Sequence, residues 1–174
     1  MADPDISVVI PVYNGERFLE PTLRAVLAQQ GVGLELIVVD DGSTDRSLDV
    51  VARVAPGARV FRQSNAGVCR ARNRGLAEAR GRAVIFLDQD DLWHPLTLAR
   101  ELSVLDAEAE RVAAVCPYHH WPPVAGRYPE PASIWGEERP ITLDPEFTGW
   151  VYHQFLFDCW ALTSGTLLRR DAVV

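Results

Sequence analysis

Two short acidic segments could hold a metal ion. Asp88-Gln-Asp-Asp91 and Asp40-Asp-Gly-Ser43 bring several carboxylates close together in the sequence. Clustered carboxylates repel one another, and they remain ionised together mainly when a cation or hydrogen-bond donors compensate their charge. Oxygen ligands suit Mg²⁺ or Mn²⁺, and such an ion usually completes its shell with water and substrate phosphates. Asp88 and Asp90 are therefore the candidate metal ligands, and the expected ligand carries a diphosphate.

Other side chains could bind the remaining parts of such a ligand. Tyr13, in Pro11-Val-Tyr-Asn14, could stack on or flank a base, and Asp41 could accept the N–H of a pyrimidine. Phosphate could pair with at least one arginine of the run Arg70, Arg72 and Arg74, in which Arg72 points away from the helix face shared by the other two. Taken alone, each segment also fits a turn, a solvated loop or a packing residue.

Alternating strands and helices must position these segments. Apolar, β-branched runs without polar alternation are typical of strands buried on both faces of a parallel sheet. They predict strands at residues 6–12, 34–39, 59–62, 83–87 and 112–116. Helical spacing predicts helices at 18–27, 48–55 (capped by Ser43 or Thr44), 67–79 and 95–105, the last opened by Pro95.

This alternation predicts a doubly wound α/β sheet. Ligands of such sheets lie beyond the carboxyl ends of the strands, where loops converge on one crevice. Three of the segments follow the end of a predicted strand: residues 11–14, 40–43 and 88–91. One crevice would therefore hold several carboxylates and an aromatic ring. Trp93 is expected to pack beneath the acidic loop.

The pattern changes after Cys116. Residues 117–145 are rich in Pro, Trp and His and predict a long surface loop. We expect residues 1–116 to form the ligand-binding α/β region and residues 117–174 to begin an acceptor-side region of the same domain. The pair His119-His120 is interpreted as part of the loop, because adjacent side chains rarely chelate one ion and no further ligand lies nearby in the sequence.

Composition excludes several classes of partner. The formal charge of −7 and the pI near 5.0 argue against a general affinity for nucleic acid or anionic lipid, because both demand a positive surface. Three distant cysteines fit a reducing compartment rather than a disulfide framework. No signal peptide or membrane-spanning run is visible, which predicts a cytoplasmic protein. An attachment to the inner face of the membrane stays open.

Four motifs together closely resemble family-2 glycosyltransferases. They are Ile6-Ser-Val-Val-Ile-Pro-Val-Tyr-Asn14, Leu36-Ile-Val-Val-Asp-Asp-Gly-Ser-Thr44, Asn65-Ala-Gly with Ala71-Arg-Asn-Arg-Gly75, and Phe86-Leu-Asp-Gln-Asp-Asp91. Each is weak alone, and their order and spacing make the match specific. The resemblance implies a GT-A fold with a mostly parallel central sheet, a nucleotide-diphosphate-sugar donor, most often a UDP-sugar, a divalent cation (Mn²⁺ or Mg²⁺), and transfer to an acceptor hydroxyl with inversion.

The resemblance also implies roles for individual residues. The nucleoside and donor site would be lined by Pro11, Val12, Tyr13, Asp41, Arg72, Asp88 and Gln89. Asp88 and Asp90 match the D-x-D motif, with Asp90 the stronger metal ligand, and Arg72 matches an arginine beside the diphosphate. The acceptor would be a glycan, a lipid-linked sugar or another hydroxyl compound.

The general base has no counterpart to which a role can be transferred. Thr163-Ser-Gly-Thr-Leu-Leu-Arg-Arg170 resembles the segment before the second half of the family's catalytic centre, which is expected beyond Val174. Inverting transfer needs a base to deprotonate the acceptor. Asp158, the one late carboxylate in an apolar and aromatic stretch, is the candidate for a substitute base.

Three other functions compete with a glycosyltransferase. A non-catalytic nucleotide-sugar-binding module of this length would bind the donor without transferring it. A sugar nucleotidyltransferase needs a glycine-rich, basic loop after its first strand, and Pro11–Glu16 (11–16) does not supply one. A phosphatase with an aspartate nucleophile usually carries D-x-D after its first strand, whereas here the motif follows the fourth.

Overall fold

The computed structural model describes residues 3–116 and 163–174. The strands are β1 (Ile6–Val12), β2 (Leu34–Asp40), β3 (Arg59–Arg62), β4 (Ala83–Phe86), β5 (Ala113–Val115) and β6 (Thr166–Arg169). The α-helices are α1 (Leu19–Leu27), α2 (Ser47–Val54), α3 (Val68–Glu78) and α4 (Thr97–Asp106), and short 3-10 helices cover η3 (Thr163–Gly165) and η4 (Arg170–Ala172). The loop expected at 117–145, the pair His119-His120 and Asp158 lie outside the described residues.

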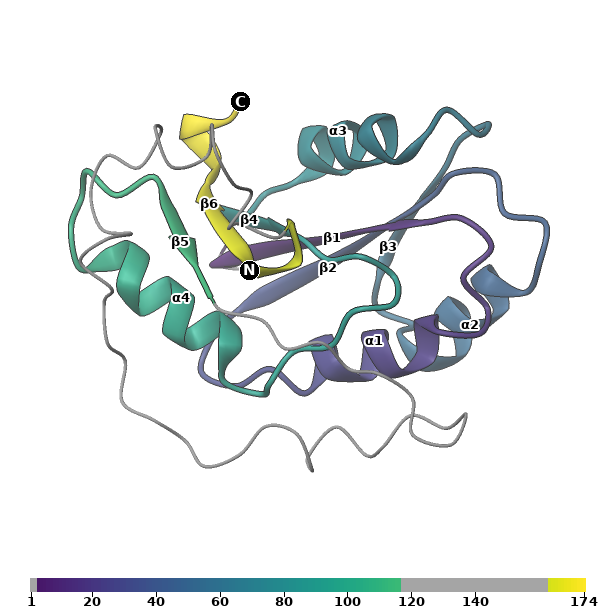
Figure 1. Cartoon of the computed structure of the whole chain (residues 1–174), viewed down its shortest axis with the longest axis horizontal. Helices are drawn as coiled ribbons and strands as arrows, with labels where there is room; N and C mark the ends of the chain where they lie inside the picture. The colour runs from purple at the N-terminus through teal and green to yellow at the C-terminus, as the bar shows by residue number, and fades with distance from the viewer. Residues whose placement is uncertain (1–2, 117–162) are drawn as a thin grey trace, which may run out of the picture.

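The strands form one six-stranded sheet in the order β3-β2-β1-β4-β6-β5. The pairs β1–β2, β1–β4 and β2–β3 are parallel, and β6 is antiparallel to both of its neighbours. In Figure 1, α3 covers one face of the sheet, and α1, α2 and α4 cover the other. The predicted α/β fold with a mostly parallel sheet between helices is confirmed.

Alternating residues of the strands build a core on each face of the sheet. On β1, Ile6, Val8, Ile10 and Val12 pack with the buried residues of α1, α2 and α4. Val9 faces the other way, into a smaller cluster. That cluster also contains Ile37, Val39, Ala71, Ala79 and Val84. Because both faces of β1 are covered, its apolar run needs no polar alternation.

The neighbour of β4 was not expected. The fifth predicted strand exists as β5, but β6 lies between it and β4, pairing Ala83 with Arg169 on one side and Ala113 with Leu168 on the other. The side chain of Arg169 then donates to the carbonyls of Leu105 and Arg111 at 2.8 and 2.5 Å. These bonds satisfy carbonyl groups at and beyond the C-terminal end of α4, where a cation is favoured. The late segment is therefore built into both the sheet and a covering helix.

The expected cap of the second helix is wrong. The α2 helix begins at Ser47, whose N–H and hydroxyl donate to Asp45 Oδ1 at 3.0 and 2.5 Å. Ser43 and Thr44 are used elsewhere: Ser43 Oγ accepts from the N–H of Asn14 at 3.0 Å, and Asn14 Oδ1 accepts from the N–H of Thr44 at 2.8 Å. The polar residues after β2 thus tie the β1–α1 loop to the β2–α2 loop. No helix among the described residues is long and apolar enough to cross a bilayer.

Candidate functional site

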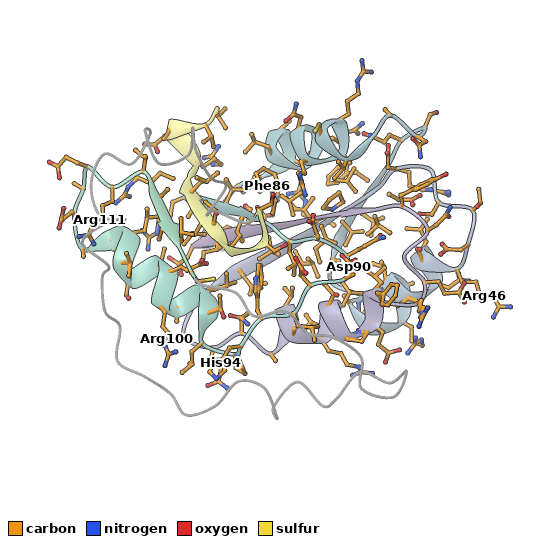
Figure 2. The ribbon with its side chains drawn as sticks, in the orientation of Figure 1. Arg46, Phe86, Asp90, His94, Arg100 and Arg111 are labelled. Carbon is orange, nitrogen blue, oxygen red and sulfur yellow. The ribbon has the colours of Figure 1, made fainter. Side chains whose placement is uncertain are left out.

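A pocket of about 580 Å³ opens at the carboxyl ends of β1, β2 and β4. Every residue assigned to the site from the sequence lines it: Pro11, Val12, Tyr13, Asp41, Arg72, Asp88, Gln89 and Asp90. The loops after the three parallel strands converge there as the topology requires. Figure 2 shows Asp90 on the loop that follows β4.

Asp41 forms a buried wall of the pocket. The side chain of Gln63 and the backbone N–H of Ala66 donate to its Oδ1 at 2.8 and 2.9 Å, and the N–H of Gly67 donates to Oδ2 at 2.8 Å. Burial opposes ionisation of this carboxyl, but the three hydrogen bonds outweigh burial and lower its pKa. A carboxylate can accept about four hydrogen bonds, so Oδ2 keeps an acceptor position for a ligand.

Arg72 and Asp88 form an ion pair at the pocket. Nη2 of Arg72, on α3, lies 2.5 Å from Oδ1 of Asp88, on the loop after β4. The Nε–H of Arg72 is buried and meets no acceptor in the described part of the chain. The arginine thus joins two walls of the pocket and retains donor capacity. Of the three arginines in the run, Arg72 alone lines the pocket, while Arg74 lies over the Phe61 ring.

Asp90 presents the most accessible carboxylate of the pocket. It is exposed, and no hydrogen bond or ion pair to it is found within residues 3–116 and 163–174. No group of three or more His, Cys, Asp or Glu residues in the same ranges could hold an ion by itself. One free carboxylate beside another suits a hard cation that takes its other ligands from phosphate and water. The residues therefore fit a cation shared with a bound diphosphate.

The base of the pocket at β1 is formed by Pro11 and Val12, with Tyr13 at its rim. Tyr13 is 48% exposed, so part of the residue is accessible to a ligand. Its backbone is held by the side-chain amide of Gln89. Gln89 therefore lines the pocket and also fixes the position of Tyr13.

Four further lining residues were not assigned from the sequence: Asn65, Gly67, Val68 and Ala71. They belong to the loop held by Asp41 and to the first turns of α3. Gly67 has φ of +90°, a conformation that favours glycine, and immediately precedes the helix. The Asn65-Ala-Gly motif before a helical pattern was the available signal. Because Gly67, Val68 and Ala71 all line the pocket, the N-terminus of α3 faces it.

A fifth residue that was not assigned from the sequence, Ser164, supports the site without lining it. Its Oγ accepts from the N–H of Asp88 at 3.0 Å, and its carbonyl accepts from Nε1 of Trp93 at 2.5 Å. Trp93 is 4% exposed, so its predicted packing beneath the acidic loop is confirmed. Burial raises the pKa of Asp91, as do the nearby Asp88 and Asp90, while a hydrogen bond from Ser164 opposes them.

Sequence comparison identifies related proteins. A family model described as glycosyl transferase family 2 matches residues 7–164. A protein of Nostoc sp., named as an uncharacterized glycosyltransferase, is 34% identical over 97% of this chain and 52% of its own length. The chain spans about half or less of the length of the relatives that it matches.

Solved structures share the fold and carry ligands. S. aureus TarS 1–349 in complex with UDP superposes with a TM-score of 0.67 and 25% identity, over 95% of this chain and 47% of TarS 1–349. A mannosyltransferase from Pyrobaculum calidifontis in complex with GDP-Man and Mn²⁺ superposes with a TM-score of 0.60 and 29% identity, over 68% of this chain and 37% of that one.

Proposed function

Because the chain belongs to glycosyl transferase family 2, we propose that its pocket binds the nucleotide-diphosphate-sugar donor of a metal-assisted, inverting glycosyl transfer. The observation that carries the proposal is the convergence of an accessible ring, a hydrogen-bonded carboxylate, an arginine and the Asp88–Asp90 (88–90) segment in one pocket. The UDP bound to TarS favours a UDP-sugar as the donor.

The nucleoside is assigned to the end of the pocket near β1 and β2. Tyr13 offers a ring face against the base, and the remaining acceptor position of Asp41 suits an N–H at the edge of a pyrimidine. Pro11 and Val12 supply an apolar floor. Since the hydrogen bonds from the loop keep Asp41 ionised, it accepts rather than donates at neutral pH.

The diphosphate is assigned to the space between α3 and the acidic loop. The N-terminus of α3 directs positive dipole ends toward the pocket, and Arg72 adds a guanidinium. The carboxylates of Asp41, Asp88 and Asp90 line the same pocket, and their negative charge opposes the binding of an anion. An anionic diphosphate enters such a site most favourably together with a cation, for which Asp90 and Asp88 are the proposed ligands. A bound Mn²⁺ or Mg²⁺ would neutralise charge on the departing diphosphate.

Acceptor activation is assigned to residues outside this pocket. Inverting transfer needs a base near the acceptor hydroxyl, whereas the pocket carboxylates lie on the proposed nucleotide and metal side. The proposed acceptor is a hydroxyl of a glycan, a lipid-linked sugar or a related compound. This chain's described residues are therefore proposed to bind and orient the donor.

Isothermal titration calorimetry with UDP tests the donor assignment. We expect binding in Mn²⁺ that weakens at least tenfold in EDTA, and a similar loss in Asp90→Ala with Mn²⁺ present. Asp171→Ala is the matched control, because Asp171 is exposed on η4 and away from the pocket lining. Absence of binding to UDP, GDP and dTDP would contradict the proposal.

A turnover measurement separates the enzyme from a non-catalytic binding module. Release of UDP from a panel of UDP-sugars, with and without added acceptors, is expected for a transferase. Release therefore identifies the transferase, whereas donor binding without release fits both proteins, because acceptor activation is assigned to residues outside this pocket.

A further inference from the structure

Ser164 connects a distant part of the chain to the acidic loop of the pocket. It is 7% exposed and does not line the pocket. Two groups of the loop donate to it: the N–H of Asp88 to its Oγ at 3.0 Å, and the indole N–H of Trp93 to its carbonyl at 2.5 Å. A single buried residue thus holds the loop at two points, Asp88 and Trp93, on either side of Asp90.

The position of Ser164 is itself fixed by the sheet. The next residue, Gly165, accepts a 2.9 Å hydrogen bond from the N–H of Cys116 through its carbonyl. A Cβ at Gly165 would lie 3.1 Å from the Cys116 sulfur, so the two segments are in close contact. The following strand, β6, is paired on both sides, with β4 and with β5. Ser164 is therefore attached to the sheet rather than to a free loop.

The acidic part of the loop, residues 88–91, needs such support because it is otherwise held mainly through Gln89, whereas Gln29 and Gln30 hold the carbonyls of His94 and Pro95 further along. Between the end of β4 and the start of α4 it has no regular structure. Gln89 is fixed by Tyr13 and by Thr22, whose hydroxyl donates to the Gln89 carbonyl at 2.9 Å. Among the described residues the Asp88 side chain pairs with Arg72, and its backbone is held by Ser164. The direction of the Asp88 carboxylate thus depends on a contact made outside the pocket.

We propose that Ser164 is a positioning residue for the donor site, which holds the backbone of Asp88 so that Asp88 and Asp90 present their carboxylates to one cation. The inference rests on the proposed function. Ser164 touches neither donor nor cation and acts through the loop. Residues that orient ligands in this way typically change metal affinity by about 10–100-fold when they are removed.

Calorimetric titration of UDP at a series of Mn²⁺ concentrations tests the proposal on the full chain. In Ser164→Ala we expect the Mn²⁺ concentration for half-maximal UDP binding to rise about tenfold, while UDP binding in EDTA is unchanged. Ser164→Thr retains the hydroxyl and is expected to stay within about threefold of the original value. Ser103→Ala, which removes a hydroxyl from exposed Ser103 on α4, is the matched control.

A second variant protects the test against misfolding of Ser164→Ala. Trp93→Phe keeps a ring in the core and removes the indole donor to Ser164, and we expect a rise of about two- to fivefold in the Mn²⁺ midpoint. A lowered melting temperature with an unchanged Mn²⁺ midpoint in both variants would overturn the inference alone. Absence of metal-dependent UDP binding by the original chain would overturn the proposed function and the inference with it.

Discussion

The side-chain amide of Gln89 pairs with both polar backbone groups of Tyr13. Its Oε1 accepts from the Tyr13 N–H at 3.0 Å, and its Nε2 donates to the Tyr13 carbonyl at 3.3 Å. A Cβ at position 15 would lie 2.5 Å from Gln89 Oε1, so Gly15 makes room for this approach. The pairing joins the loop after β4 to the loop after β1 along one wall of the pocket.

Replacing Gln89 should therefore weaken nucleotide binding. In Gln89→Ala both hydrogen bonds are lost and the Tyr13 ring is no longer held at the rim. We expect the dissociation constant for UDP in Mn²⁺ to rise about fivefold to tenfold, which corresponds to about 1–1.4 kcal/mol in total, near the lower end for two hydrogen bonds. Calorimetry measures it, with Gln30→Ala as the control, since Gln30 is exposed and away from the pocket lining. Equal affinities in the two variants would contradict the role given to Gln89.

Asp41→Asn should destabilise the fold near neutral pH. In the original chain three N–H groups donate to the Asp41 carboxylate. The Asn amide group is itself a donor, so at least one of these hydrogen bonds is lost, and we expect a loss of about 2–3 kcal/mol in the free energy of unfolding at pH 7. The folded pKa of Asp41 is lowered, so its contribution is present above the unfolded value of about 3.9 and is lost as pH falls through the folded value. Urea unfolding from pH 7 downward should show the difference shrinking. Asp171→Asn should follow the original chain throughout.

Glu101→Gln should remove a pH-dependent cost. Glu101 is 3% exposed on α4, and burial raises its pKa to about 8 despite the neighbouring Cys116. The folded state holds this proton more tightly than the unfolded chain, so stability falls as pH rises from about 4.5 toward 8. We expect the free energy of unfolding of the variant, relative to that of the original chain, to increase by up to about 1.4 kcal/mol per pH unit in that window. Denaturant unfolding from pH 5 to 9 measures it, against exposed Glu110→Gln. A difference that stays constant with pH would refute it.

Gly75→Ala should loosen the contact between α3 and the sheet. A Cβ at Gly75 would overlap the side chain of Val9, and both residues are buried. We expect a loss of about 1–3 kcal/mol in the free energy of unfolding. At Gly57 a Cβ meets nothing within 4 Å, so Gly57→Ala should be neutral or stabilising by up to about 1 kcal/mol. Thermal and urea unfolding compare them, and similar effects at both positions would argue against the close packing of α3.

The central part of the fold was predictable because its signals are local. The composition of the apolar runs that form β1 and β4 is enough to predict that they are buried strands. The strand β3 was also predicted, with the bounds that the structure gives it. The site followed from topology, since loops after parallel strands meet at one edge of the sheet. Tyr13, Asp41 and Asp90 share the pocket for that reason.

The remaining features depend on contacts that are distant in the sequence. In β6 only Leu167 and Leu168 are apolar, and they face opposite cores, so the segment carries no periodic pattern. Nothing local indicates that it pairs with β4. The role of Ser164 could not be predicted for the same reason. A serine before a glycine is typical of a turn, and its partner Asp88 lies 76 residues earlier in the sequence. The prediction that Ser43 or Thr44 caps α2 is wrong because both residues form hydrogen bonds with Asn14 instead.

The position of β6 has a consequence for biosynthesis. A chain that leaves the ribosome from its N-terminus presents β1 to β4 long before β6 exists, at about 5–20 residues per second. During those seconds the outer edge of β4 lacks its β6 partner, and β5 lacks the strand that links it to the sheet. Unpaired edges can recruit other chains, and such non-local pairing forms slowly. We therefore expect the yield of soluble protein to depend on how well the nascent chain is protected while this edge is open.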